Sequence, residues 1–321
     1  MKQKFTTLDR VHAEYRDLVQ NVIFDFSKAE IFAESKKSFA DAADQGRPPT
    51  AHWIAPATKT QPAVDLYAYL PQKVNSKLPI IYFMHGGCYL VGTARQSNDA
   101  LHQLAERHQA AVVSVEYRLA TQAPFPADLH DAYHGLSFLY QNANQLNLDS
   151  EHMLLMGESA GGGLAARLAL YTRDQGEFTI KGQVLIYPML DHRTATSSSQ
   201  YHNPSAGEFV WPAISNQMGW SALRGGASIP EQQLAYFSPS MATSLHGLPP
   251  TYLIVGDLDL FVNEDIDYAN RLIEAGVPTE LQVMRGLVHG FDLLKPDSEP
   301  TQQYITSRDQ AIERMLLPSV K

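Results

Sequence analysis

Apolar runs of strand length alternate with helical spacing along most of the chain. The runs predict strands at these positions: 64–70, 80–84, 111–117, 153–156, 183–187, 251–255 and 280–284. Apolar residues at helical spacing predict helices at 100–108, 126–146, 263–275 and 301–316, and another directly after residue 160. Strands that alternate with helices are typical of a mostly parallel sheet, so the pattern predicts an α/β fold.

Two segments interrupt this alternation. Residues 8–45 mix charges with apolar residues at helical spacing, which predicts amphipathic helix until Gly46 and two prolines end it. Residues 191–238 contain no clear strand and are too long for an ordinary connection. A binding element and a disordered segment are the alternatives there, and the aromatic residues favour a packed element. We therefore expect one domain over 51–321, with 1–50 and the insertion 191–238 added to it.

Composition narrows the class of protein. A chain of 321 residues with 44% hydrophobic content can bury a large core, and the net charge of −9 without a basic cluster argues against nucleic acid or an anionic membrane surface as partner. The single cysteine excludes an internal disulfide and a cysteine-based zinc site. The charged first ten residues lack the apolar stretch of a signal peptide, and no run reaches membrane-spanning length. We expect a cytoplasmic protein.

The strongest local motif follows the apolar run 153–156. It reads Gly157-Glu158-Ser159-Ala160-Gly161 and leads into helical spacing. A G-x-S-x-G turn between a strand and a helix raises its serine above the sheet edge, and the helix N-terminus adds free N–H groups and a positive dipole end. A helix-capping serine is the alternative, but the strand before and the helix after favour Ser159 as a nucleophile.

A serine hydroxyl needs a base, and that base needs an orienting acid. In folds with this turn, the acid and then the histidine come later in the chain, each in a loop after a strand. Asp257 and Asp259 both follow the predicted strand 251–255, so the spacing leaves two candidates for the acid. His289 follows the predicted strand 280–284 and is the candidate base.

A second loop has the composition of an oxyanion site. The predicted strand 80–84 is followed by His85-Gly86-Gly87-Cys88. Two adjacent glycines remove both Cβ atoms, which lets backbone N–H groups face a ligand, although a simple tight turn would use the same residues. An oxyanion hole combines such a loop with the N–H of the residue after the nucleophile, here Ala160, and each donor contributes about a hundredfold in rate.

Two further features have structural interpretations. His130 and His134 lie four apart on a predicted helix, a spacing that a metal can use, but no third ligand accompanies them. We therefore expect neither a metal nor another cofactor. Cys88 could be proposed as a nucleophile, yet it lies outside the G-x-S-x-G turn and has no assigned histidine, so a small buried residue is the simpler interpretation.

Four motifs, in this order, resemble the hormone-sensitive-lipase-like branch of the α/β-hydrolase esterases. They are His85-Gly86-Gly87, then Glu116-Tyr117-Arg118-Leu119-Ala120 with Pro124-Phe125-Pro126-Ala127, then Gly157-Glu158-Ser159-Ala160-Gly161-Gly162, and Gly286 with His289-Gly290-Phe291. The similarity extends from about residue 78 to residue 291. It implies an α/β-hydrolase fold, with a mostly parallel central sheet flanked by helices and a helical cap built from 1–50 and 191–238.

The resemblance also assigns the catalytic roles. Ser159 becomes the nucleophile and His289 the base, while a family pattern matched by Gly256, Asp259 and the pair Glu264-Asp265 favours Asp259 over Asp257 as the acid. The expected oxyanion donors are the backbone N–H groups at the following positions: Gly86, Gly87, Cys88 and Ala160.

One residue departs from the family pattern in this loop. Cys88 occupies the place of a third glycine. We expect it to have a negative φ, which lets it donate its N–H, and to pack its side chain beside the acyl site.

The implied function is that of a serine carboxylesterase acting on small uncharged esters with short acyl or aryl groups. Phe209, Trp211 and Trp220 in the insertion are the expected substrate contacts. An amidase or deformylase with the same triad is the nearest alternative, and a catalytically dead binding protein on the same fold is the other. That second alternative is disfavoured because the histidine is kept. Members of the family often dimerise, so the resemblance makes a homodimer possible, and the sequence alone does not decide the oligomeric state.

Overall fold

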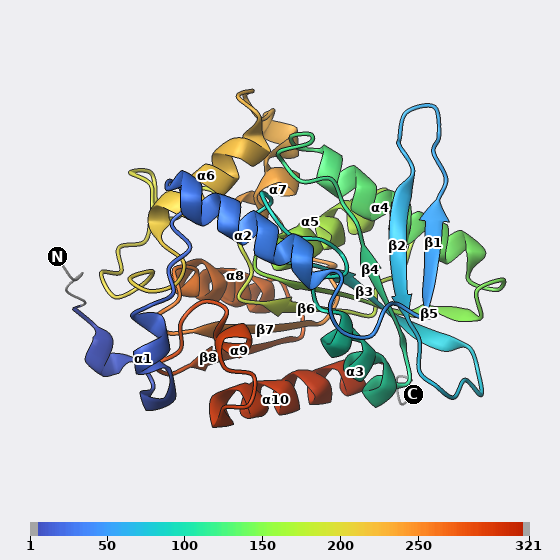
Figure 1. Cartoon of the computed structure of the whole chain (residues 1–321). Coiled ribbons are helices and arrows are strands. Elements are labelled where there is room, and N and C mark those ends of the chain that lie inside the picture. The colour runs from blue at the N-terminus through green and yellow to red at the C-terminus, as the bar shows by residue number, and fades with distance from the viewer. Residues whose placement is uncertain (1–5, 317–321) are drawn as a thin grey trace.

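An eight-stranded sheet forms the centre of the computed structural model, which describes residues 6–316 (Figure 1). The strand order is β1-β2-β4-β3-β5-β6-β7-β8. The strands are β1 Ala51–Ala55, β2 Val64–Tyr69, β3 Leu78–Met84, β4 Ala111–Val115, β5 Leu148–Glu158, β6 Gly182–Ile186, β7 Thr251–Gly256 and β8 Thr279–Met284. The pairings of β1 with β2 and of β2 with β4 are antiparallel, and the others are parallel. The predicted α/β fold with a mostly parallel sheet is confirmed.

Helices cover the sheet. α3 and α10 contact each other beside β4 and β5, whereas α4 and α5 pack together on the opposite face (Figure 1). The helices are α1 Arg16–Val19, α2 Ala29–Ala42, α3 Asn98–His108, α4 Ala127–Asn142, α5 Ala160–Gln175, α6 Ala213–Arg224, α7 Leu234–Phe237, α8 Val262–Glu274, α9 Phe291–Leu294 and α10 Glu299–Leu316. Every residue of β4, β6 and β7 is buried, which explains why these strands are continuous apolar runs in the sequence.

The predicted elements exist, but some of their ends differ. β4 ends at Val115 rather than at residue 117, and α4 ends at Asn142 rather than at residue 146. β5 begins at Leu148, five residues before the predicted start, because Leu148 and Asp149 already pair with the beginning of β3. The hydrophobic pattern missed β1, whose side chains are mostly exposed or half-buried at the edge of the sheet.

The amphipathic helix predicted for 8–45 is wrong over its middle part. Two 3-10 turns and α1 precede α2, and residues 22–25 between the two helices are neither helix nor turn. Ile23 forms a parallel bridge with Val210, and the N–H of Phe24 donates to the Val210 carbonyl at 2.8 Å. The conformation of this segment therefore depends on Val210, which lies 186 residues after Phe24. The spacing of apolar residues within the segment could not predict that contact.

The insertion 191–238 is packed, as its aromatic residues predicted. It contains α6 and α7, and Trp211 and Trp220 are both buried. None of the helices within residues 6–316 combines the length and apolar composition needed to cross a bilayer.

Candidate active site

Ser159 lies at the sharp turn between β5 and α5. Its φ of 56° is in the left-handed region, where a residue with a side chain is strained. The turn is tight because α5 starts directly above the end of β3: a Cβ on Gly161 would lie 2.1 Å from the Met84 carbonyl oxygen. The strand, the turn and the small residues that follow thus hold the Ser159 hydroxyl above the sheet edge.

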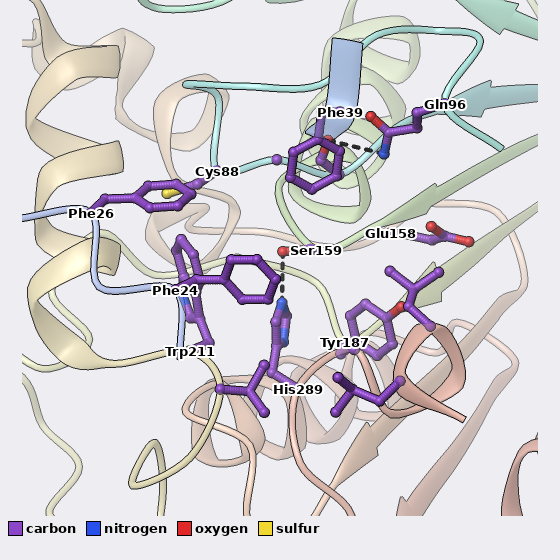
Figure 2. A pocket seen from close by; sticks show the side chains of 16 residues that line it. Phe24, Phe26, Phe39, Cys88, Gln96, Glu158, Ser159, Tyr187, Trp211 and His289 are labelled. Carbon is purple, nitrogen blue, oxygen red and sulfur yellow. Dashed lines mark hydrogen bonds between the residues drawn. The ribbon is translucent and has the colours of Figure 1, made fainter. Parts of the chain in front are cut away.

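Three side chains from different strand ends meet at this point, and Figure 2 shows two of them, Ser159 and His289. The Ser159 Oγ lies 2.9 Å from His289 Nε2, and the His289 Nδ1 lies 2.7 Å from an Asp259 carboxylate oxygen. Asp259 is buried, and its other oxygen accepts the N–H of Phe261 at 3.0 Å, which holds the carboxylate in place. This geometry can remove a proton from the hydroxyl and stabilise the imidazolium that results.

Asp257, the other candidate acid, has different partners. Its carboxylate accepts the backbone N–H of Gly286 at 2.6 Å and lies 3.4 Å from the Arg10 guanidinium. Asp257 therefore braces the loop that carries His289 without contacting the imidazole. The structure brings together Ser159, His289 and Asp259.

The loop after β3 lies against the serine turn. A Cβ on Gly86 would lie 3.5 Å from the Ser159 Cβ, so this backbone passes beside the nucleophile. Gly87 has a φ of 131°, and a Cβ there would lie 2.0 Å from the Val91 carbonyl oxygen. Among residues 6–316, none accepts a hydrogen bond from the backbone N–H of Gly87, Cys88 or Ala160. These donors stay available to a ligand.

His85 braces this loop from behind. Its buried ring stacks on Tyr117 with ring centroids 4.4 Å apart, and the Tyr117 hydroxyl donates to the His85 carbonyl at 2.7 Å. Burial lowers the pKa of His85, so the ring is held neutral.

The prediction of a negative φ at Cys88 is wrong. Cys88 has a φ of 57°, and Tyr89 after it has a φ of 61°, because the loop turns back so that the N–H groups of Leu90 and Val91 both reach the Gly87 carbonyl. The Cys88 side chain nevertheless lines the cavity beside Ser159. Its sulfur donates to the Ser215 carbonyl at 3.4 Å, and burial raises the pKa of this thiol far above its ordinary value.

A cavity of about 210 Å³ opens above Ser159 and His289. Its apolar wall contains the following residues: Phe24, Phe26, Phe39, Val210, Trp211, Leu293 and Leu294 (Figure 2). The three phenylalanines come from the N-terminal segment and were not predicted as site residues. The alternation of Phe24 and Phe26 around a polar residue was the signal for an extended strand-like piece.

The insertion contributes only part of the predicted contacts. Trp211 lines the cavity, and its ring centroid lies 6.0 Å from that of His289. Phe209 and Trp220 are not among the lining residues. Trp220 points to the other side of α6, where it packs on Tyr89 and Phe237.

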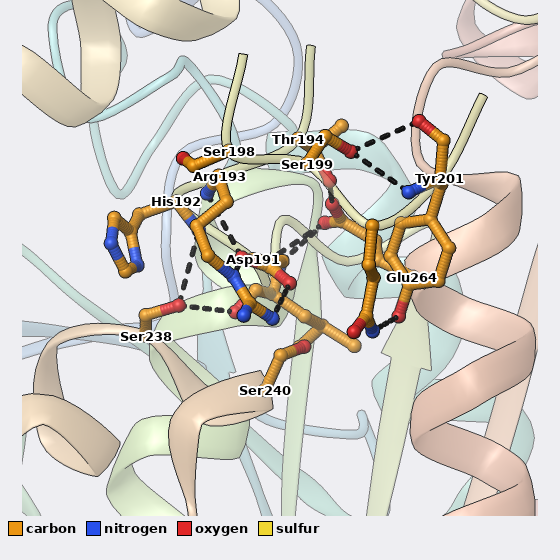
Figure 3. A network of polar contacts seen from close by, with 12 residues as sticks. Asp191, His192, Arg193, Thr194, Ser198, Ser199, Tyr201, Ser238, Ser240 and Glu264 are labelled. Atoms are coloured by element: carbon orange, nitrogen blue, oxygen red, sulfur yellow. Dashed lines mark hydrogen bonds and ion pairs between the residues drawn. The ribbon is translucent and has the colours of Figure 1, made fainter. Parts of the chain in front are cut away.

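Glu264 anchors the start of the insertion to α8 (Figure 3). Its buried carboxyl accepts the N–H groups of Leu190 and Asp191 at 2.6 and 3.2 Å and the hydroxyl of Thr194. Burial raises the pKa of Glu264 well above its usual range. The insertion therefore leaves the sheet in a fixed direction.

Two carboxyl side chains, Glu158 and Asp292, lie near each other, and Glu158 lies across Ser159 from Phe26 (Figure 2). Glu158 lines the cavity, and Asp292 accepts the Tyr187 hydroxyl at 2.8 Å close by. Burial, together with the charge of Asp292, raises the pKa of Glu158 to about 8. No sequence pattern predicts this pair, because Asp292 approaches Glu158 only in the folded chain.

The histidines four apart on α4 have protein partners. His134 Nε2 lies 2.8 Å from the Pro56 carbonyl oxygen, and the His130 ring packs near Tyr171. Within the described part of the chain, no group of three or more His, Cys, Asp or Glu side chains could hold a metal ion.

Comparison with known proteins finds similarity over most of the chain. A family model described as alpha/beta hydrolase fold matches residues 81–293. A putative alpha/beta hydrolase of Acanthamoeba polyphaga mimivirus is 29% identical over 70% of this chain and 64% of its own length. Carboxylesterase NlhH of Mycobacterium tuberculosis is 30% identical over 71% of each chain. The chain thus spans about two thirds of the length of these relatives.

A solved structure covers the chain almost completely. A bacterial heroin esterase superposes with a TM-score of 0.87 at 31% identity, over 98% of this chain and 100% of the other. The similarity therefore includes the N-terminal segment and the insertion as well as the sheet.

Proposed function

The chain belongs to the hormone-sensitive-lipase-like family of the alpha/beta hydrolase fold, and from this premise we propose that it is a serine carboxylesterase for small uncharged esters with short acyl or aryl groups. The observation that carries the proposal is the hydrogen-bonded series Ser159, His289 and Asp259 at the base of an apolar cavity. It is a carboxylic ester hydrolase, in keeping with relatives named carboxylesterase and heroin esterase.

In the proposed reaction, the Ser159 Oγ attacks the ester carbonyl carbon while His289 Nε2 takes the hydroxyl proton. Asp259 accepts the His289 Nδ1–H, keeps the imidazole in the required tautomer and stabilises its protonated form. The tetrahedral intermediate collapses, the alcohol leaves with the proton from His289, and the acyl group stays on Ser159. Water then attacks the acyl-enzyme by the same steps, which releases the acid and restores Ser159.

The negative oxygen of each tetrahedral intermediate needs donors that are already in place. We assign this role to the backbone N–H groups of Gly87, Cys88 and Ala160, with Gly86 making room beside Ser159. Their lack of acceptors among the described residues supports the assignment, since donors that are not bonded within the protein stabilise charge at no cost of rearrangement.

Residues 1–50 and 191–238 form the proposed cap. Support comes from the bond between the Phe24 N–H and the Val210 carbonyl, and from the Phe26 N–H that donates to the Ser215 hydroxyl at 2.8 Å. These contacts join the two segments over Ser159 and make one apolar wall of Phe24, Phe26 and Trp211. A cavity of about 210 Å³ with such a wall suits a small apolar acyl or aryl group.

Replacing Ser159 by Ala tests the proposal. The purified variant should lose turnover of p-nitrophenyl acetate, and retained turnover would refute the assignment of the nucleophile. A serine-directed phosphonate should label the unmodified protein and the Cys88→Ala variant alike, which excludes the cysteine as nucleophile. Rates on an ester and on its matching anilide distinguish an esterase from an amidase with the same triad.

Two finer predictions belong with this proposal. A cytoplasmic location is expected from the sequence, and fractionation of cells that express the chain would test it. The family resemblance makes a homodimer possible, and light scattering on the purified protein would test it.

A further inference from the structure

Glu158 is the one acidic side chain among the described residues that line the cavity. It precedes Ser159 directly, and its carboxyl forms no hydrogen bond or ion pair with any residue in 6–316. Figure 2 shows Glu158 on the side of the cavity with Gln96 and Tyr187, across Ser159 from Cys88 and Phe26. A substrate that extends to this side therefore reaches an unpaired carboxyl.

The groups around Glu158 leave its charge without a partner. Asp292 on α9 is another acid, and the Tyr187 and Tyr304 hydroxyls face the same region. Arg308 on α10 is the nearby cation, but its guanidinium already lies 2.8 Å from the Asp309 carboxylate. An ionised Glu158 thus makes this side of the cavity negative.

We propose that Glu158 determines specificity by favouring esters that carry a compact cationic group, such as a substituted ammonium, on the alcohol portion. The inference rests on the proposed esterase function and extends its substrates from uncharged esters to cationic ones. A cation near Glu158 would neutralise the unpaired carboxylate, whereas an anionic group would be repelled by Glu158 and Asp292. The apolar side of the cavity is left to the acyl group.

The protonation of Glu158 makes this preference depend on pH. Burial and the neighbouring Asp292 raise the pKa of Glu158 to about 8 in the free protein. Below that pH the carboxyl is mostly neutral and offers a cation little attraction, and above it the carboxylate is formed. The preference for a cationic ester should therefore increase as pH rises through about 8.

Two acetate esters of the same shape test this. Acetylcholine has a quaternary ammonium that carries its charge at every pH, and 3,3-dimethylbutyl acetate replaces it by a neutral tert-butyl group. Values of kcat/KM are measured for both from pH 6 to 9.5 and corrected for spontaneous hydrolysis. Both esters acetylate Ser159, so their ratio cancels the titration of the triad. The ratio should rise about tenfold across pH 8, as expected for a partly screened charge pair.

Three variants complete the test. In Glu158→Gln the ratio should lose its rise with pH, whereas in Glu177→Gln, which removes an exposed acid that accepts the Tyr133 hydroxyl, the rise should remain. Asp292→Asn removes the neighbouring acid and should move the midpoint of the rise to lower pH.

Several results would overturn the inference. They are a ratio that is flat in the unmodified protein, a rise that persists in Glu158→Gln, and a midpoint that Asp292→Asn leaves unmoved. Hydrolysis of the neutral ester alone would overturn this inference and leave the esterase proposal intact. Hydrolysis of neither ester would overturn both.

Discussion

Gly219 on α6 faces the sulfur of Cys88 so closely that a Cβ at position 219 would lie 2.1 Å from Sγ and 2.8 Å from the Cys88 carbonyl oxygen. This contact joins the insertion to the loop whose N–H groups we assign to the oxyanion hole. The two residues pack only because one of them has no side chain.

Replacing Gly219 by Ala should therefore destabilise the protein, although the same change inside an ordinary helix stabilises it by up to about 1 kcal/mol. Overpacking predicts a loss of about 1–3 kcal/mol in the free energy of unfolding, measured by urea titration. Adding Cys88→Gly removes the sulfur and suits the positive φ, so the double variant should recover part of the loss. A single variant at least as stable as the unmodified protein would contradict the contact.

Asp259 and Asp257 should differ sharply when each is changed to Asn. Asp259→Asn leaves the size of the side chain unchanged but favours the wrong tautomer of His289, so kcat for p-nitrophenyl acetate should fall by about four orders of magnitude. Asp257→Asn should reduce kcat only slightly, because Asp257 contacts Gly286 and Arg10 rather than the imidazole. If Asp257→Asn caused the larger loss, the acid would have to be reassigned.

Ser215 holds the two phenylalanines of the N-terminal segment. Its hydroxyl accepts the Phe26 N–H at 2.8 Å and donates to the Phe24 carbonyl at 2.7 Å. Ser215→Ala leaves both backbone groups unpaired, which should cost about 1–3 kcal/mol of stability and raise KM as the wall loosens. Thermal unfolding and ester kinetics measure the two effects. Ser221→Ala, at an exposed position on the same helix, is the control and should change neither.

Asp265 should make stability depend on pH. It is buried, neither of its oxygens has a partner among the described residues, and burial with the nearby Glu264 and Asp259 raises the pKa of Asp265 well above its ordinary value. In the unfolded chain this carboxyl ionises near its usual pKa. The unfolded state therefore holds fewer protons above about pH 4, and the free energy of unfolding falls as pH rises toward the folded pKa.

Asp265→Asn removes this titration at nearly constant shape. The variant should have a higher free energy of unfolding than the unmodified protein, and the difference should be small at pH 4. At a pH above the folded pKa of Asp265, the difference should have increased by about 1.4 kcal/mol for each unit by which this pKa exceeds that of the unfolded chain. Urea unfolding at pH 4, 6 and 8 measures it, and parallel curves for the two proteins would refute the prediction.

The residues at the strand ends could be predicted from sequence because local pattern specifies them. Continuous apolar runs mark the strands that are buried on both faces, and Ser159 and Asp259 come just after two of them. His289 comes after β8, whose residues are half-buried or exposed, so its position in the chain order was the signal. The choice between Asp257 and Asp259 was different. Both residues follow β7, and they differ only in which way their side chains point in the folded loop. Spacing alone therefore could not identify the acid, and the choice of Asp259 came from the family resemblance.

Other features depend on contacts that no local pattern reports. Phe24 and Phe26 line the cavity because residues 20–28 bond to Val210 and Ser215, far along the chain. Trp211 and Trp220 are nine residues apart in the insertion, yet Trp211 precedes α6 and packs near His289, whereas Trp220 lies on α6 and packs on Tyr89 and Phe237. The positive φ of Cys88 follows from the way the loop folds back on Gly87, which its residue types alone do not reveal.

The reacting groups at the base of the cavity and the apolar residues of its wall come from different segments of the chain. Strand ends supply the reacting groups, while residues 20–28 and 209–215, which bond to each other, supply much of the wall. Substitutions in the wall can therefore reshape what the enzyme accepts without disturbing the chemistry below it. Variants made to accept new substrates should therefore be sought first in those two short stretches.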